Sequence, residues 1–142
     1  MSEQASCVFC QIVAKRAPAA IVDEDQWTLS FVDLRQANRG HVLVVPKAHH
    51  ADIRQLDAET AGALMQTIVR ITQAVGATFP NQGLSLWNSI GPAAFQEVPH
   101  VHFHIHPRLP EDQLLRIYPG SPATAEMEQR ERIAEQLRRR LG

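Results

Sequence analysis

The sequence predicts an α+β fold: a five-stranded antiparallel sheet with one long helix and a C-terminal helix. Three observations predict it. Short β-like segments outnumber helical ones, a single long amphipathic segment interrupts them, and the strands on either side of that segment are short. The length of 142 residues is typical of one domain, so we expect a single domain over residues 1–142.

The strands are predicted from β-branched residues and from the alternation of apolar and polar side chains. The clearest alternation covers residues 27–33, and a β-branched run ends at Pro46. The predicted strands are two pieces within 20–33, followed by 41–45, 84–88 and 101–106.

The long helix is predicted over residues 57–78, where Asp57 can cap the N-terminus and Pro80 follows the end. Its predicted buried stripe consists of Leu64, Met65, Ile68, Val69, Thr72 and Val75. A proline-rich stretch after residue 106 precedes a last helix over about 124–141, with Glu and Arg paired at i,i+4. We expect a loose tail over residues 1–6.

Composition excludes several classes of protein. The formal net charge of -1 argues against a general nucleic-acid coat and against a polybasic membrane binder. No apolar run approaches the roughly 20 residues that a membrane helix needs. The N-terminus lacks the basic and apolar regions of a secretion signal, so we expect a cytoplasmic protein without nucleic-acid or membrane partners.

Four of the seven histidines occupy alternate positions from His100 to His106. In a strand, alternate side chains share a face, so this histidine row faces one side and Val101, Phe103 and Ile105 face the core. Three consecutive histidines of the row span about 13 Å and can hardly ligate one ion. The row therefore indicates a phosphate or metal site, whereas an incidental cluster would usually lack an apolar counter-face.

Cys7 and Cys10 form a C-x-x-C pair. Three interpretations are open: a long-range zinc site completed by two histidines, a pair of buried reduced thiols, or a redox pair, for which the expected βαβ context is absent. His49 and His50 follow the third strand, and either can be an ordinary surface residue.

The histidine row matches the histidine triad pattern His-φ-His-φ-His-φ-φ, in which φ is apolar, and Gln96-Glu97-Val98 and Pro107-Arg108 flank it. Further matching segments follow in the same order upstream: Cys7-Val-Phe-Cys10, Phe31-Val-Asp33, Gly40-His41 and Val44-Val-Pro46-Lys47-Ala-His49. Over residues 7–108 the chain resembles bacterial-type members of the histidine triad (HIT) superfamily. Residues 109–142 are not covered by the resemblance.

This resemblance implies a homodimeric hydrolase or transferase that acts on purine nucleotides. It would cleave at the α-phosphate of nucleoside phosphoramidates or dinucleoside polyphosphates through a nucleotidyl-histidine intermediate. His102 resembles the nucleophile, His104 a ligand of the phosphate oxygens, and His41 a supporting histidine. Two alternatives are a non-catalytic nucleotide-binding or signalling module, and a metal-dependent enzyme in which His100 and His102 hold a catalytic ion.

The resemblance also implies the remaining site residues. Those expected to bind substrate are Phe9, Ile12, Phe31 and Leu34 at the base, Asp33 at the ribose, and Asn88 and Glu97 at the phosphates. Those expected to hold a structural zinc ion are Cys7, Cys10, His49 and His100.

The chain departs from the family pattern at four positions. His106 replaces an apolar residue, Phe95 stands where many members have glycine, and Asn88 lies one residue further from the triad than expected. Glu97 replaces a serine or threonine, which predicts a different leaving-group preference.

Overall fold

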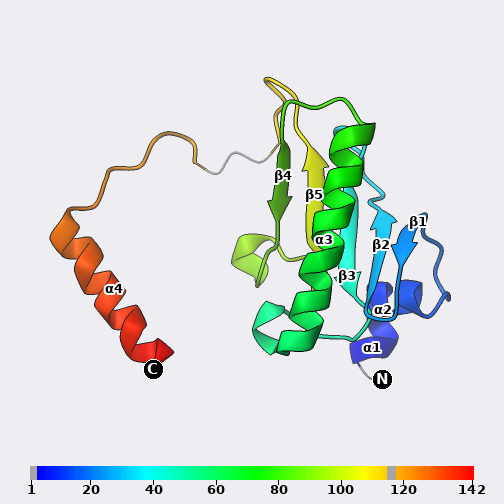
Figure 1. Cartoon of the computed structure of the whole chain (residues 1–142), viewed down its shortest axis with the longest axis horizontal. Helices are drawn as coiled ribbons and strands as arrows, with labels where there is room; N and C mark the ends of the chain where they lie inside the picture. Colours follow the sequence, from blue (N-terminus) through cyan, green and yellow to red (C-terminus); the bar gives the residue numbers. More distant parts are fainter. Residues whose placement is uncertain (1–2, 115–117) are drawn as a thin grey trace. The chain divides into compact units, whose positions relative to one another are not determined.

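The computed structural model describes residues 3–114 and 118–142, and the chain divides into two compact units, 1–112 and 113–142. In the first unit, five strands form one antiparallel sheet in the order β1-β2-β3-β5-β4 (Figure 1). The strands are β1 (Ile21–Glu24), β2 (Thr28–Val32), β3 (Val42–Pro46), β4 (Leu84–Trp87) and β5 (Phe103–Pro107). The predicted five-stranded α+β fold is confirmed.

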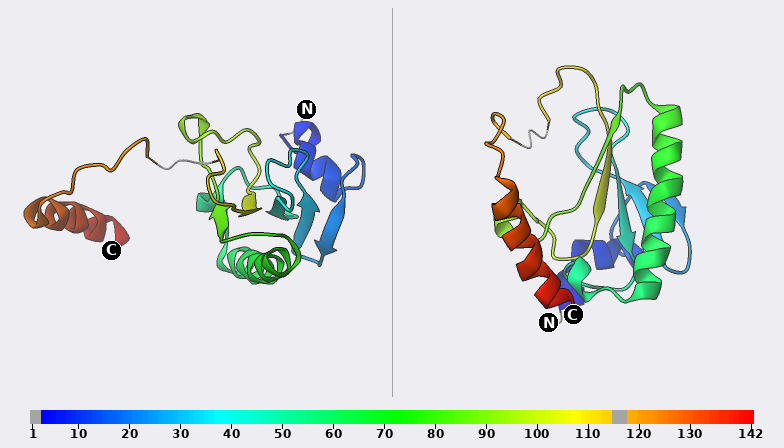
Figure 2. Two further views of the ribbon diagram at one scale, coloured as in Figure 1. Left: turned by 90° about the horizontal axis from the view of Figure 1, so that it is seen from above. Right: turned by 60° about the vertical axis from the view of Figure 1, so that its left-hand side comes forward.

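Helices cover the two faces of the sheet differently, as Figure 2 shows. The long helix α3 (Ala58–Thr78) packs on one face, against a core that includes Val44, Val101 and Ile105. The short helices α1 (Glu3–Ser6) and α2 (Val8–Val13) belong to the other face, where α2 packs on β2 and β3. The second face of β5 therefore remains available for the histidines.

Helix α3 begins where the sequence predicts, because the Asp57 carboxylate accepts a hydrogen bond from the Thr60 N–H at 2.7 Å. The predicted stripe is only partly right, since Met65 and Val69 are about half exposed. They lie one residue beyond the buried positions and so face sideways. The buried residues are Thr60, Leu64, Thr67, Ile68, Ile71 and Val75.

The prediction of a loose tail over 1–6 is wrong for residues 3–6, which form α1; residues 1–2 lie outside the described part. Helix α2, which the sequence analysis missed, begins at Cys7, whose Sγ accepts a hydrogen bond from the Cys10 N–H at 3.4 Å. Six residues are too few for helical periodicity to stand out.

The fifth strand begins at Phe103 instead of Val101. The preceding residues lie outside the ladder, and the Val101 N–H donates to the His50 carbonyl at 2.9 Å. Two short 3-10 turns, η1 (Ile53–Gln55) and η2 (Pro92–Ala94), lie in the loops before α3 and β5.

In the second unit, α4 (Met127–Leu141) begins later than the predicted start at residue 124. It starts at Met127, the first of its apolar residues. Ion pairs join Glu128 to Arg132 and Glu135 to Arg139, each at 2.8 Å. All of α4 is described, and none of its residues is buried. Within residues 3–114 and 118–142, no helix has the length and apolar character needed to cross a membrane.

Gly40 links β2 to β3 with a φ of +113°, and a Cβ there would lie 2.6 Å from Phe79 Cδ2. We predict that Gly40→Ala lowers the free energy of unfolding by about 2 kcal/mol or more, through strain and overpacking. Gly62→Ala is the matched control, because no described atom lies within 4 Å of its Cβ on α3. This variant should gain about 0.5–1 kcal/mol. Urea unfolding of both variants measures the difference, and equal effects would contradict the prediction.

Candidate functional site

Two histidines of the row, His100 and His104, belong to two separate clusters on the face of the sheet opposite α3. The first is a Cys–His cluster of four side chains, Cys7, Cys10, His49 and His100, whose ligand atoms all lie within 4.8 Å of one another. The cysteines come from the start of α2, His49 follows β3, and His100 precedes β5. The fold thus brings together the four residues that the sequence analysis expected to hold zinc.

The geometry of the Cys–His cluster fits a tetrahedral zinc ion. His100 Nδ1 lies 3.5 Å from each cysteine Sγ and 3.2 Å from His49 Nδ1. Because the Pro46 carbonyl can only accept, His100 Nε2 must donate to it, at 2.8 Å, and Nδ1 then presents its lone pair to the thiols. Burial raises the pKa of the Cys10 thiol to about 11 without metal, so a cation would have to displace its proton.

His102 is buried, with its ring held in one tautomer. Its Nδ1–H donates to the His100 carbonyl at 2.8 Å, which leaves a lone pair on Nε2. Burial lowers the pKa of this ring, so it is neutral near pH 7. Phe9 lies edge-on to it, with the ring centroids 5.0 Å apart. A neutral imidazole with a free nitrogen can act as a nucleophile.

The second cluster consists of Asp33, His41 and His104, whose ligand atoms also lie within 4.8 Å of one another. His41 Nε2 is 2.9 Å from His104 Nδ1 and 3.8 Å from Asp33 Oδ2. The pKa of His104 is lowered to about 3, first by burial and then by neighbouring histidines. Burial also lowers the pKa of His41, against the opposing charge of Asp33. Both rings are therefore neutral at pH 7.

Trp87 is a site residue that the sequence analysis missed. Its ring stacks on His104 with the centroids 4.3 Å apart and an interplanar angle of 6°. The β4–β5 register places Trp87 directly opposite His104, so correct strand pairing would have revealed it. His106 is buried and packs against His41, with the two ring centroids 4.4 Å apart. Its Nδ1–H donates to the Pro107 carbonyl at 2.9 Å.

The expected substrate-binding residues occupy different environments. Phe9 and Ile12 of α2 are buried together with Phe31 of β2, whereas Leu34 is fully exposed. The Asn88 amide donates to the His102 carbonyl at 2.9 Å, so Asn88 reaches the triad despite its shifted sequence position.

The loop over residues 89–99 carries two of the departures from the family pattern. Glu97 is exposed and lines a hollow of about 350 Å³ beside Cys7 and His49, and its charge raises the pKa of His102 slightly against the effect of burial. Phe95 is 86% exposed and has a left-handed φ of 65°.

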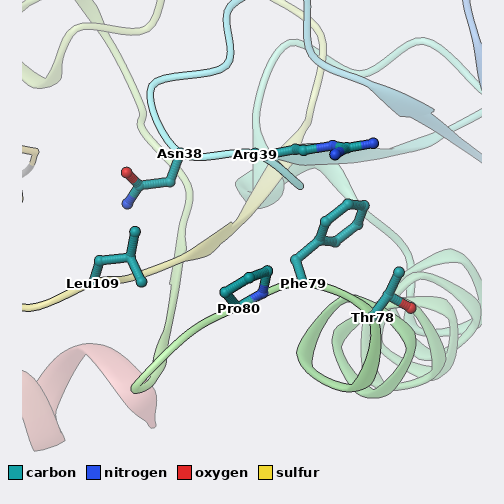
Figure 3. A pocket seen from close by; sticks show the side chains of 6 residues that line it. All are labelled: Asn38, Arg39, Thr78, Phe79, Pro80 and Leu109. Carbon is teal, nitrogen blue, oxygen red and sulfur yellow. The ribbon is translucent and has the colours of Figure 1, made fainter.

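Two other hollows lie at the end of α3. One has a volume of about 360 Å³ (Figure 3), and a larger apolar one of about 500 Å³ shares Arg39, Thr78 and Phe79 with it. The Arg39 guanidinium lies over the Phe79 ring at 5.8 Å. None of the predicted site residues, all within the described range 3–114, lines either hollow.

The HIT domain family model matches residues 14–111 of the chain. The chain belongs to the histidine triad (HIT) family. An adenosine 5'-monophosphoramidase of Schizosaccharomyces pombe is 34% identical to it over 121 residues, which cover 82% of this chain and 88% of that protein. The matched segment begins after Cys10, so the family model leaves out half of the Cys–His cluster.

Solved structures of HIT proteins share the fold. A member of the HIT family from Bacillus subtilis aligns with a TM-score of 0.90 and 32% identity, over 96% of this chain and 98% of that one. A Zn-bound histidine triad family protein from Mycobacterium smegmatis aligns with a TM-score of 0.71 and 35% identity, over 91% and 90% of the two chains.

Neutral histidines in this HIT site predict a pH dependence. The pKa of His104 is about 3 in the folded chain and about 6.5 when unfolded, so below pH 6.5 the unfolded state binds more protons and folding is penalised. Wild type should therefore lose about 1–2 kcal/mol more free energy of unfolding than His104→Gln between pH 7 and pH 5. Urea unfolding at both pH values measures this, and equal losses would contradict it.

Proposed function

We propose that this HIT protein is a nucleotide hydrolase or transferase that acts at the α-phosphate through a nucleotidyl-histidine on His102. The observation that carries the proposal is the bond from His102 Nδ1–H to the His100 carbonyl, which aims a free Nε2 lone pair out of a buried, neutral ring. The similarity to an adenosine 5'-monophosphoramidase supports a nucleoside phosphoramidate as substrate.

The proposed reaction has two displacement steps. His102 Nε2 attacks the α-phosphorus and a P–N bond forms, while the bond to the amine or polyphosphate leaving group breaks and its electron pair departs with that group. An amine leaving group takes up a proton from solvent as it departs. Water or another acceptor then attacks the same phosphorus and releases the histidine. The Nδ1–H bond persists throughout, and it stabilises the positive charge that develops on the ring.

The second cluster serves the phosphate in this proposal. His104 Nδ1–H donates to His41 Nε2, and His41 Nδ1–H donates to the Arg35 carbonyl at 3.3 Å, so the two rings form an oriented chain. A bound phosphate would raise the pKa of His104, because a negative charge favours the protonated ring. Its Nε2 could then donate a hydrogen bond to a phosphate oxygen.

Asp33 lies beside the hydrogen-bonded rings of His41 and His104, and its acceptor-only carboxylate suits the two hydroxyls of a ribose. For the base, we propose that a purine packs against the exposed Leu34 and the outer edge of the buried cluster that contains Phe9, Ile12 and Phe31. We assign Asn88 to holding the His102 carbonyl, and Glu97 to leaving-group selection through its negative charge. We also propose a homodimer, because β4 is a sheet edge that another chain could cover.

We further propose that the Cys–His cluster holds a structural zinc ion. Two thiolates and two imidazoles complete a tetrahedral shell, so no position stays open for substrate. The ion would connect α2 and His49, which follows β3, to His100. The His100 carbonyl in turn orients His102. The Zn-bound relative from Mycobacterium smegmatis supports this assignment.

The first test of the function is direct detection of the intermediate. After mixing of the protein with an adenosine phosphoramidate or a dinucleoside polyphosphate and early quenching at neutral or alkaline pH, wild type should show an acid-labile adenylyl adduct by intact mass. His102→Ala should show none, because the attacking nitrogen is gone. Turnover should fall by at least about 10³-fold. A persistent adduct in His102→Ala would exclude this nucleophile. Nucleotide binding without an adduct or turnover would favour a non-catalytic nucleotide-binding module.

Zinc can be tested by substitution of neighbouring histidines. His49→Ala should lose the bound zinc and unfold at lower temperature, because one of four ligands is removed. His50→Ala is the matched control, since His50 lies outside the cluster. Metal content by mass spectrometry and thermal unfolding measure both effects. Equal zinc content in the two variants would contradict the assignment.

A further inference from the structure

We propose that Asp33, His41 and His104 form a second metal site, specific for a transition-metal ion such as Zn²⁺ or Cu²⁺. Occupancy of this site would exclude nucleotide from the pocket. The site is separate from the Cys–His cluster and shares no side chain with it. The binding stands on geometry alone, whereas the exclusion of nucleotide rests on the proposed function.

The distances suit direct coordination. Bonds of about 2.0–2.2 Å place neighbouring ligand atoms about 3 Å apart in octahedral geometry and about 3.5 Å apart in tetrahedral geometry. The observed separations from His41 Nε2 are 2.9 Å to His104 Nδ1 and 3.8 Å to Asp33 Oδ2. These two values bracket the required ones. The third separation, between Asp33 and His104, is within 4.8 Å, so side-chain rotation on binding must bring these two ligands to coordination distance.

The backbone of a single residue orients two of the three ligands. The Arg35 N–H donates to Asp33 Oδ1 at 2.8 Å, so Oδ2 is left to face His41. The Arg35 carbonyl accepts from His41 Nδ1, which fixes the lone pair on Nε2. The third ligand, His104, is held by stacking on Trp87. Such outer-shell support is typical of metal sites.

In the metal-free chain, a proton takes the place of the ion. The His104 Nδ1–H points at His41 Nε2, and a cation would displace this proton to His104 Nε2. Both rings then stay neutral and bind through one nitrogen each. No oxidant or net proton release is needed, and the carboxylate supplies one negative charge.

The donor set selects the metal. Two imidazoles and one carboxylate suit Zn²⁺, Cu²⁺ or Ni²⁺ better than Mg²⁺ or Ca²⁺, which prefer oxygen. Three protein ligands leave a position open to solvent. This site should therefore bind more weakly and reversibly than the closed Cys–His cluster. An ion there would occupy the Asp33 carboxylate needed for the ribose.

The binding test uses protein that already holds one equivalent of Zn²⁺, titrated with Co²⁺ and Zn²⁺ by calorimetry and absorption. Wild type should bind one further ion without the sulfur-to-cobalt bands of a thiolate site. Asp33→Asn and His41→Gln should each weaken this event by at least about tenfold. Asp52→Asn is the matched control, because this partly buried carboxylate pairs with Arg54 outside both clusters. No second ion, or equal binding by all variants, would overturn the proposal.

Tryptophan fluorescence gives an independent readout of position. Co²⁺ on His104 should quench Trp87, which stacks on that ring, and Trp87→Phe should lose the quenching while still binding the ion. Retained quenching in Trp87→Phe would place the ion elsewhere.

AMP binding to wild type, with and without the second ion, tests the exclusion of nucleotide. Unchanged AMP affinity would overturn that part. A second ion that binds as described, in a protein that forms no adduct with any nucleotide, would refute the proposed function and leave the metal site standing.

Discussion

The His100 side chain is the contact on which the rest of the site depends. It is fully buried, and each of its polar groups has a separate task. Nε2–H fixes the ring to the end of β3 through the Pro46 carbonyl, and Nδ1 faces both cysteines. Its backbone carbonyl holds His102 in the tautomer with a free Nε2. One residue, His100, therefore connects α2, the end of β3 and the candidate nucleophile His102.

The alternation of an extended chain explains why such different environments lie so close together. Val101 and Ile105 enter the core beneath α3, while the histidines between them share the opposite face. Along that face, the environment changes about every 6.6 Å, from thiols at His100 to aromatic rings at His104. Burial keeps these rings neutral by lowering their pKa values, so their lone pairs are available for metal or phosphorus.

The sequence pattern alone was enough to predict the features that depend on a few neighbouring residues. Asp57 as a helix cap and the alternation of the histidine row are examples, and both hold in the structure. Features set by tertiary packing were less accessible to sequence reasoning. Helix α2 is short and is held by packing on β2 and β3, and Met65 faces sideways because of how α3 sits on the sheet. The partnership of Trp87 with His104 required the register of two strands distant in sequence.

The departure at His106 can be understood from the packing of rings around it. An apolar side chain at this position would need no polar partner, whereas a buried imidazole must place its nitrogens. One nitrogen donates to the Pro107 carbonyl, which makes burial of the ring tolerable. The His106 ring then packs on His41, and its centroid lies 5.8 Å from the centroid of the Trp87 ring. His106 thus helps to exclude water from His41, and a drier His41 interacts more strongly with any charge bound beside it.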